Sequence, residues 1–230
     1  PISARTKSNC YFTLESARFW GRHWCVPISF VGKMKILESE LPLFPLNTVL
    51  FPQGRLPLQI FEPRYREMIA RCLEKDLAFG ILLIPEGHPV GGLATPHEIG
   101  TLARIVDSAR LPDGRMNIVV VGVARFKLLE LFNDRVYMTG QIQVLADENV
   151  NLELAERDVR QVTQVFREYV AMIRRVINPN EEPEKEADDL DLPKDPTLLS
   201  YTIAASLPIS TSDKQFGCSP KRSSFSCTGL

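Results

Sequence analysis

Residues Leu41–Ile69 read LPLFPLNTVLFPQGRLPLQIFEPRYREMI, and this stretch holds the clearest succession of structural patterns in the chain. The apolar, proline-punctuated residues 40–51 predict an edge strand with a bend, and residues 56–60 predict a second strand. Pro63 is well suited to the first position of a helix. Apolar residues then recur at i, i+3, i+4, i+7 and i+8 from Tyr65 to Leu73, which predicts a half-buried helix ending near Asp76.

The residues that follow are rich in strand signals. Residues 77–84, LAFGILLI, form a continuous apolar run, which predicts a strand buried on both faces. A loop rich in Pro and Gly is expected at 85–96. Four further strands are then predicted at 99–111, 115–123, 126–132 and 136–145, with a Pro112-Asp113-Gly114 turn between the first two. Six or seven strands at these intervals predict a closed or nearly closed antiparallel barrel, which makes residues 34–150 a β-rich body.

The hydrophobic period changes after residue 150. Asn151 is a candidate N-cap for a long helix whose apolar residues alternate at spacings of four and three; they are Ala155, Val159, Val162, Phe166, Tyr169, Ile173 and Val176. An acidic linker at 181–195, a helix from Pro196 to about Ser206 and the start of another helix near Asp213 follow. Residues 151–215 are therefore predicted to form a helical subdomain. The stripe could serve an intermolecular coiled coil, but packing of helices within the chain is the interpretation that we favour.

The two ends of the sequence lack such patterns. Residues 1–33 show no regular period and hold one acidic residue against five Lys and Arg, and they are interpreted as an unpatterned N-terminal extension. A transit peptide is the alternative for this segment. Residues 216–230, FGCSPKRSSFSCTGL, contain no acidic residue and are interpreted as an anomalous tail. A natural disordered segment, a shifted reading frame or a truncation would each produce such a change in pattern.

Composition argues against several classes of protein. The chain has 230 residues, 27 Lys and Arg against 28 Asp and Glu, and 44% hydrophobic residues, which is ordinary globular composition. The balanced charge argues against a nucleic-acid partner, and no apolar run approaches the length that spans a membrane. Five cysteines without a C-x-x-C pair suit a reducing compartment, which favours a cytoplasmic location. Cys72 falls within the predicted helix and is expected to be a small core residue.

No pattern for catalysis or for a cofactor is found. The sequence contains no G-x-x-x-x-G-K-[ST] phosphate loop, no G-x-S-x-G elbow and no H-E-x-x-H motif. His88 and His97 flank the glycine-rich loop without a third ligand cluster, so they are interpreted as solvated loop residues and not as a metal site. We therefore predict a binding protein, with no catalytic residues, no cofactor and no metal.

The segment Leu41–Ile69 resembles the opening of the Lon protease N-terminal domain, also called the Lon substrate-binding domain. The resemblance continues through FGILLI (79–84), IGTLARI (99–105), DGR (113–115) and GVARFKLLE (122–130), and it reaches about Leu207. It implies an α+β fold, with a PUA-like six-stranded antiparallel pseudo-barrel followed by a helical bundle. In Lon this domain helps to recognise unfolded or tagged polypeptides and assists assembly of the ring. Here the ATPase and Ser-Lys protease modules are absent, so the chain resembles a stand-alone form of the domain.

The resemblance favours a non-catalytic polypeptide-binding module, such as an adaptor in protein quality control that acts with a separate ATPase. The candidate surface is where Phe61, Arg64 and Tyr65 leave the barrel for the helix, although we favour a packing role for these residues, with Arg64 paired to a carboxylate. The alternatives are a PUA-like RNA-binding module, an assembly domain for a specific folded partner, and a small-molecule enzyme using a groove beside the helices. Partial exposure of the stripe on the long helix predicts weak self-association into a homo-oligomer.

Overall fold

The computed structural model describes residues 40–85, 96–147, 152–177, 190 and 192–218. Within them lie six strands, which are β1 (Leu41–Leu46), β2 (Arg55–Ile60), β3 (Phe79–Leu83), β4 (Ile99–Arg110), β5 (Met116–Phe132) and β6 (Thr139–Val144). The helices are α1 (Pro63–Lys75), α2 (Leu152–Ile177), α4 (Pro196–Ser206) and α5 (Thr211–Cys218). This content confirms the predicted α+β class. The expectations for residues 1–33, most of the glycine-rich loop, the Asn151 cap and most of the acidic linker lie outside the described residues.

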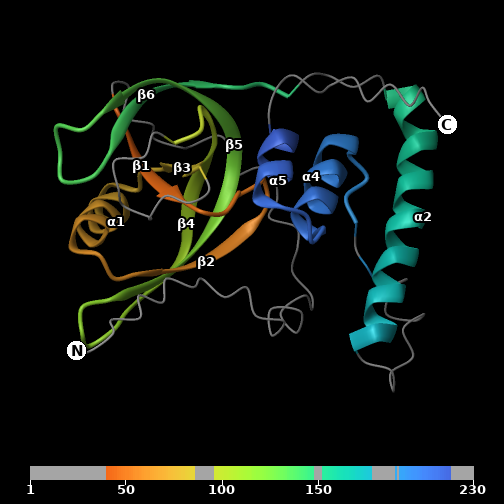
Figure 1. Ribbon diagram of the computed structural model, residues 1–230, viewed down its shortest axis with the longest axis horizontal. Helices are drawn as coiled ribbons and strands as arrows, with labels where there is room; N and C mark the ends of the chain where they lie inside the picture. Colours follow the sequence, from red (N-terminus) through yellow and green to blue (C-terminus); the bar gives the residue numbers. More distant parts are fainter. Residues whose placement is uncertain (1–39, 86–95, 148–151, 178–189, 191, 219–230) are drawn as a thin grey trace, which may run out of the picture.

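The strands form one mixed sheet in the order β2-β5-β4-β3-β1-β6, and β5 also pairs with β6 (Figure 1). Five strands, β5, β4, β3, β1 and β6, therefore pair in a cycle, and β2 lies outside the cycle against β5. The expectation of a purely antiparallel arrangement is wrong, because β1 and β3 run parallel, with Leu43 opposite Gly80 and Leu46 opposite Leu83. The chain between them contains β2 and α1, and a connection of that length lets it return in the same direction.

The expectation that residues 40–51 form an edge strand is also wrong. All six residues of β1 are buried, and the strand lies between β3 and β6. Its prolines are tolerated because N–H groups alternate sides along a strand, and the Leu43 N–H points to the β6 side, where it bonds to the Met138 carbonyl. The nitrogen of Pro42 thus faces β3, one residue before the pairing of β1 with β3 begins at Leu43. The nitrogen of Pro45 faces β6, beyond the residues of β1 that pair with β6. Neither proline removes a bond from the sheet.

β5 replaces two of the predicted strands. The segments expected at 115–123 and 126–132 form one strand of 17 residues, which pairs with β2, β4 and β6. The break in the sequence pattern coincides with an irregularity in the pairing of β5 with β4. Leu102 lies opposite Ala124 while Ala103 lies opposite Gly122, so Val123 is an extra residue in β5. Such a bulge bends a strand and increases its twist. The bend allows one strand to serve three neighbours.

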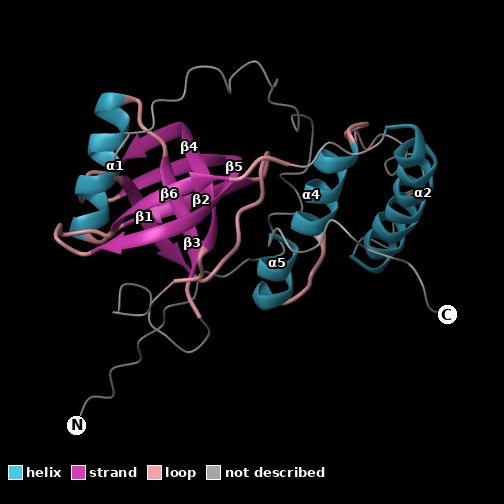
Figure 2. Ribbon diagram, turned by 90° about the horizontal axis from the view of Figure 1, so that it is seen from above, coloured by secondary structure: helices cyan, strands magenta, loops and turns pink. Residues whose placement is uncertain are grey.

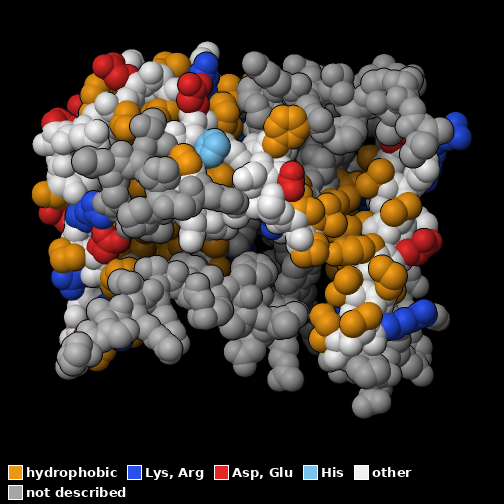
Figure 3. All heavy atoms as spheres, viewed as in Figure 1, with side chains coloured by type: hydrophobic (Ala, Val, Ile, Leu, Met, Phe, Trp, Pro, Cys, Tyr) orange, Lys and Arg blue, Asp and Glu red, His pale blue; other side chains and the backbone are white. Residues whose placement is uncertain are grey.

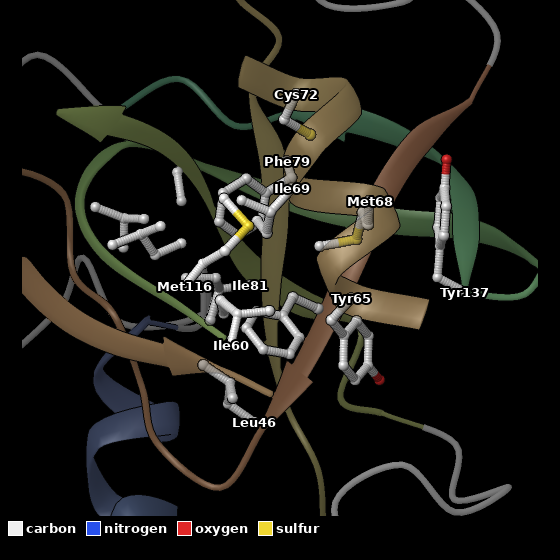
Figure 4. Packing of buried hydrophobic residues seen from close by; sticks show 14 of the residues in the cluster. Leu46, Ile60, Tyr65, Met68, Ile69, Cys72, Phe79, Ile81, Met116 and Tyr137 are labelled. Atoms are coloured by element: carbon white, nitrogen blue, oxygen red, sulfur yellow. The ribbon is translucent and has the colours of Figure 1, made fainter. Parts of the chain in front are cut away.

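Helix α1 covers one side of the sheet (Figures 1 and 2). Its buried face consists of Tyr65, Met68, Ile69 and Cys72, which pack with Ile60, Phe79, Ile81 and Met116 (Figure 4). The helix begins at Pro63 and ends at Asp76, which adopts a left-handed φ of 50°, so both predicted ends are confirmed. The prediction of a core role for Cys72 is likewise confirmed, since 1% of this residue is exposed. β3 is buried on both faces, as its apolar run predicted.

The remaining helices form a second layer beside the sheet. Helices α5 and α4 lie between the sheet and α2 (Figures 1 and 2). A small core of Phe51, Tyr201 and Cys218 joins them to the sheet. Helix α5 extends three residues into the segment expected to be an anomalous tail, and Cys218 at its end is buried. Among the described side chains of α2, Phe166 alone is buried, so the predicted partial exposure of its stripe is confirmed.

Candidate functional site

β2 is the one described strand that pairs on a single side. It runs antiparallel to β5 over its whole length, from Arg55 opposite Val121 to Ile60 opposite Met116. The Gly122 N–H donates to the Gly54 carbonyl at 3.0 Å, so the even-numbered residues of β2 direct their backbone groups toward β5. The odd-numbered residues, Arg55, Pro57 and Gln59, therefore direct theirs to the open side. We call this row of backbone groups the β2 edge.

The β2 edge offers an incomplete set of hydrogen-bonding groups. Arg55 and Gln59 each present an N–H and a carbonyl, whereas Pro57 presents a carbonyl alone because proline has no N–H. Pro57 removes no bond to β5, since its side of the strand faces away from that partner. A proline at such a position also discourages indiscriminate pairing with other sheet edges.

Apolar side chains lie beside the β2 edge. Leu56 and Leu58 are only partly buried, although they pack against the core cluster beneath α1. On the opposite face of the strand, Gln59 is exposed and its Nε2 donates to the Asn117 Oδ1 at 3.3 Å. A further strand placed along the edge would cover more of Leu56 and Leu58, which the present sheet leaves open to solvent.

The three predicted site residues lie together at the junction of β2 and α1, but in different environments. Phe61 directly follows β2 and is 64% exposed. Tyr65 is buried, with its ring centroid 4.4 Å from that of Phe44. Arg64 donates to the Glu62 Oε2 through Nε at 2.8 Å and Nη2 at 2.6 Å, and its guanidinium lies 4.9 Å from the Tyr65 ring centroid. The sequence favours a packing role for all three residues. The structure has Tyr65 buried and Arg64 paired with the Glu62 carboxylate, but the expectation is wrong for Phe61, which is exposed.

The pKa shifts of Tyr65 and Arg64 are consistent with a structural role for both residues at the junction of β2 and α1. Burial raises the pKa of the Tyr65 phenol, and the positive charge of Arg64 offsets only part of that rise, so the phenol stays neutral at physiological pH. Burial lowers the pKa of Arg64, but the hydrogen bond to Glu62 and the electrostatic attraction of Tyr65 and Glu62 together outweigh it, so the net shift of the pKa is upward. Of the three residues, Phe61 presents the largest exposed fraction to a ligand.

A polar junction missed by the sequence analysis holds the helices to the sheet. The Arg125 Nη2 on β5 donates to the Asp147 Oδ1 at 2.7 Å, and the Tyr201 hydroxyl of α4 donates to the same oxygen at 2.5 Å. The Arg125 Nη1 also donates to the Cys218 carbonyl of α5 at 3.0 Å. Burial and the bond to Asp147 both raise the pKa of Tyr201. We call Arg125, Asp147 and Tyr201 the junction triad.

The small crevice beside the junction triad is an internal seam. It is lined in part by Leu50, Thr101 and Gln215. The Thr101 hydroxyl donates to the Leu50 carbonyl at 2.6 Å, and the Gln215 Nε2 donates to the Ile99 carbonyl at 2.8 Å. Both side chains therefore have partners within the protein, and the crevice presents no unmet polar group of theirs to a ligand.

Neither a metal cluster nor a membrane-spanning helix is found in the described part of the chain. No three His, Cys, Asp or Glu side chains of the described residues are grouped to hold a metal ion. None of the described helices combines the length and apolar character needed to cross a membrane.

Comparison with known sequences points to one family. A family model for the ATP-dependent protease La (LON) substrate-binding domain matches residues 40–216. A Lon protease of Anaeromyxobacter dehalogenans (strain 2CP-C) is 31% identical over 118 residues, which are 50% of this chain and 14% of that protein. Lon protease 1 of Hydrogenovibrio crunogenus is 27% identical over 186 residues, or 78% of this chain and 22% of that protein. The chain thus spans less than a quarter of the length of these relatives.

Two solved structures share the fold. The Lon N-terminal domain protein from Xanthomonas campestris matches with a TM-score of 0.52 and 23% identity, over 77% of this chain and 88% of that one. The N-terminal domain of a Mycobacterium avium complex Lon protease matches with a TM-score of 0.55 and 14% identity, over 79% of this chain and 91% of that one. At these identities the likeness concerns the fold.

Proposed function

Because this chain belongs to the LON substrate-binding domain family, we propose that it is a non-catalytic module that binds unfolded or extended polypeptide. In this proposal the cyclic sheet with β2 at its side is the PUA-like pseudo-barrel that the family resemblance implies. The module acts as an adaptor in the cytoplasm and passes its clients to a separate ATPase. Phe61 and the β2 edge supply the binding surface, while Arg64 and Tyr65 hold the corner that presents Phe61.

The observation that carries the proposal is the open side of β2. An extended polypeptide that lies along this edge can accept from the N–H groups of Arg55 and Gln59 and donate to the carbonyls of Arg55, Pro57 and Gln59. Each such bond contributes a net of about 0.5–1.5 kcal/mol. Because these bonds involve the backbone of the client, they impose little sequence preference, as recognition of many unfolded chains requires.

The apolar groups around the edge would add affinity. A client strand would cover the partly buried Leu56 and Leu58, and Phe61 at the end of β2 could pack against an apolar client residue. Burial of apolar surface contributes about 25 cal/mol per Å² before the costs of association. This combination predicts binding that survives added salt, in contrast to recognition of RNA phosphates.

The alternatives have less support. The net charge of −1 and the mixture of acidic and basic residues along α1 do not favour an RNA-binding module. An assembly domain for a specific folded partner would use the same exposed surfaces, but it would bind a folded control protein and ignore an unfolded one. Binding measurements with RNA, a folded protein and an unfolded polypeptide therefore distinguish these three functions.

The test is fluorescence anisotropy of the whole chain with a labelled, permanently unfolded polypeptide, a folded control protein and a short structured RNA. Gln59→Pro removes one N–H from the β2 edge, and Gln59→Ala is its matched control because it shortens the side chain but keeps that N–H. We expect Gln59→Pro to weaken binding of the unfolded polypeptide by about 2–10-fold and Gln59→Ala to change it little. Thermal melts establish that both variants fold.

Three results would count against the proposal. Equal binding by Gln59→Pro and Gln59→Ala would show that the β2 edge does not contact the client. Preferential, steeply salt-dependent binding of RNA would support an RNA-binding module instead. Binding of the folded control alone would favour the assembly domain.

A further inference from the structure

The side chains of β2 alternate between two rows on opposite faces of the strand. Arg55, Pro57 and Gln59 form an exposed row, whereas Leu56 and Leu58 are partly buried and pack against the core cluster beneath α1. A strand that paired along the β2 edge would continue both rows, because side chains of neighbouring strands point to the same alternate faces. Every second client residue would therefore lie beside the leucines, and the residues between them would lie beside the exposed row.

The row that contains Leu56 and Leu58 favours apolar client residues. Both leucines lie at the margin of the core, so an aliphatic client residue beside them would remove water from its own surface and from theirs. A polar client residue at the same position would gain no such burial, and its polar group would be partly desolvated. Phe61, which directly follows β2 and is 64% exposed, extends this apolar margin beyond the strand.

The exposed row favours polar client residues. Gln59 lies opposite Asn117 of β5, and the Gln59 Nε2 donates to the Asn117 Oδ1 at 3.3 Å. A serine, threonine or asparagine of the client beside Gln59 would keep its hydrogen bonds to water, because this face of the strand is open to solvent. A client that is apolar at every position would leave half of its side chains on this face and bury little of their surface.

Charge distinguishes the two ends of the exposed row. Arg55 lies opposite Val121 of β5, and Val121 lies opposite Arg104 of β4, so two arginines occupy one row across the sheet. Asp76 forms an ion pair with Arg104 at 3.4 Å, whereas Arg55 makes no ion pair with a described residue. The β2 edge therefore ends in a positive charge that has no described counter-ion of its own.

The acidic groups of this region are too far away or already paired. Asp107 of β4 lies opposite Val119, which pairs with Pro57, so Asp107 is two strand spacings, about 10 Å, from β2. Glu62, at the other end of β2, forms an ion pair with Arg64. A client strand would lie a single strand spacing, about 5 Å, from β2. A client carboxylate beside Arg55 would thus complement the nearest charge.

We propose that the β2 edge selects client segments in which apolar and polar residues alternate and an acidic residue lies beside Arg55. This preference rests on the proposed function, because it names the class of polypeptide that the same edge binds. The edge discriminates against uniformly apolar runs and against segments whose apolar residues recur at the three- and four-residue spacing of a helix. Arg55 is the residue that determines the charge preference.

Short peptides test the pattern by fluorescence anisotropy with the whole chain at low salt. The first peptide alternates three valines with two threonines and carries one terminal aspartate, the second has the same residues with the valines consecutive, and the third has lysine in place of the aspartate. Each is made with its charged residue at either end, so that one version meets Arg55 whichever way the client runs. We expect the better version of the first peptide to bind about three- to thirtyfold more tightly than the second and about two- to tenfold more tightly than the third.

Charge reversal tests the role of Arg55. Arg55→Glu should invert the preference between the aspartate and lysine peptides, and it should keep the preference for alternation because the leucines are unchanged. Arg157→Glu is the matched control, since Arg157 is an exposed residue of α2. Helices α4 and α5 separate α2 from the sheet, and other apolar side chains gather along α2 (Figure 3). A peptide bound there instead would respond to Arg157→Glu and not to Arg55→Glu. Thermal melts verify that both variants fold.

The permanently unfolded polypeptide is the reference ligand, so the two proposals can fail separately. If it binds while the peptides do not bind, or while the alternating and consecutive peptides bind alike, the pattern is wrong and polypeptide binding stands. An unchanged charge preference in Arg55→Glu would show that Arg55 does not contact the client. If neither the unfolded polypeptide nor any peptide binds, the proposed function itself is contradicted and the pattern fails with it.

Discussion

Removal of the Tyr201 hydroxyl should weaken the attachment of the helices to the sheet. Tyr201→Phe keeps the ring, whose centroid lies 6.2 Å from that of Phe51, and removes only the bond to Asp147. A hydrogen bond to a charged group contributes about 1.5–3 kcal/mol. The Asp147 side chain is 40% exposed, so water can replace the lost hydroxyl in part. We therefore expect a loss of about 1–2 kcal/mol in the free energy of unfolding.

Asp147→Asn should cost more than Tyr201→Phe. The Arg125 side chain is only 13% exposed, and its buried Nε already makes no hydrogen bond to a described residue. Loss of the carboxylate leaves this guanidinium without its compensating charge, which we expect to cost about 2–3 kcal/mol after allowance for the exposure of Asp147. The two changes act on one oxygen, so the double variant should lose less than the sum of the single losses.

Urea unfolding followed by circular dichroism measures these differences. For a domain of this size, Tyr201→Phe should lower the melting temperature by about 2–8 °C. Tyr169→Phe is the matched control, because the Tyr169 hydroxyl makes no hydrogen bond to another described residue and its removal should change stability by less than about 0.5 kcal/mol. Equal effects of Tyr201→Phe and Tyr169→Phe, or full additivity in the double variant, would refute the reasoning about the junction triad.

Three further predictions concern stability and thiol reactivity. A Cβ at Gly122 would lie 2.2 Å from the Phe51 carbonyl oxygen, so Gly122→Ala should lower the free energy of unfolding by at least about 3 kcal/mol. A Cβ at Gly217 would meet nothing within 4 Å, so Gly217→Ala should stabilise α5 by up to about 1 kcal/mol. Chemical unfolding of both variants checks this contrast, and similar effects of the two changes would contradict it. Burial raises the pKa of Cys72 to about 11, so about one thiol in a thousand is ionised at pH 8 and mass spectrometry should find it alkylated only after denaturation. The same shift should lower stability as pH rises from about 9 to 11, because the folded state keeps a proton that the unfolded chain releases. Asp195→Ala removes the N-cap of α4 and should cost about 1 kcal/mol in thermal or urea unfolding, and an unchanged midpoint would show that the cap does not contribute.

Local sequence patterns were sufficient to predict most of the helices and strands. The apolar stripe of α1, its first proline and its end at Asp76 are all encoded within 14 residues, and the structure confirms each of them. The continuous apolar run of β3 likewise predicted burial on both faces. These features depend on neighbours along the chain, which is the information that a sequence carries directly.

The arrangement of β1 could not be predicted in the same way. A proline in a strand is tolerated wherever its missing N–H has no partner, and an edge is only one such place. In β1 the tolerance comes from partners that start or stop at different residues on its two sides. That register is set by strands about 40 and 100 residues further along, so the local pattern of residues 40–51 was compatible with both positions.

The candidate site was predictable only in part. Pro57 within a short alternating strand was an available signal for an edge, and it lies in the element that proves to have an open side. The grouping of Phe61, Arg64 and Tyr65 followed from their closeness in sequence. The junction triad gave no such signal, because Asp147 is 22 residues from Arg125 and 54 from Tyr201. Only the folded sheet brings these three together.

The dependence of so many strands on β5 has a consequence for how the chain emerges from the ribosome. β2 has no sheet partner among the described residues until β5 is made, and the pairing of Arg55 with Val121 spans 66 residues, 121 minus 55. At about 5–20 residues per second, β2 waits roughly 3–13 seconds after its own synthesis. During that delay β2 lacks its strand partner, whereas β1 can already pair with β3 but not yet with β6. The three prolines of these strands withhold N–H groups throughout the delay, which limits mispairing before the proper partner arrives.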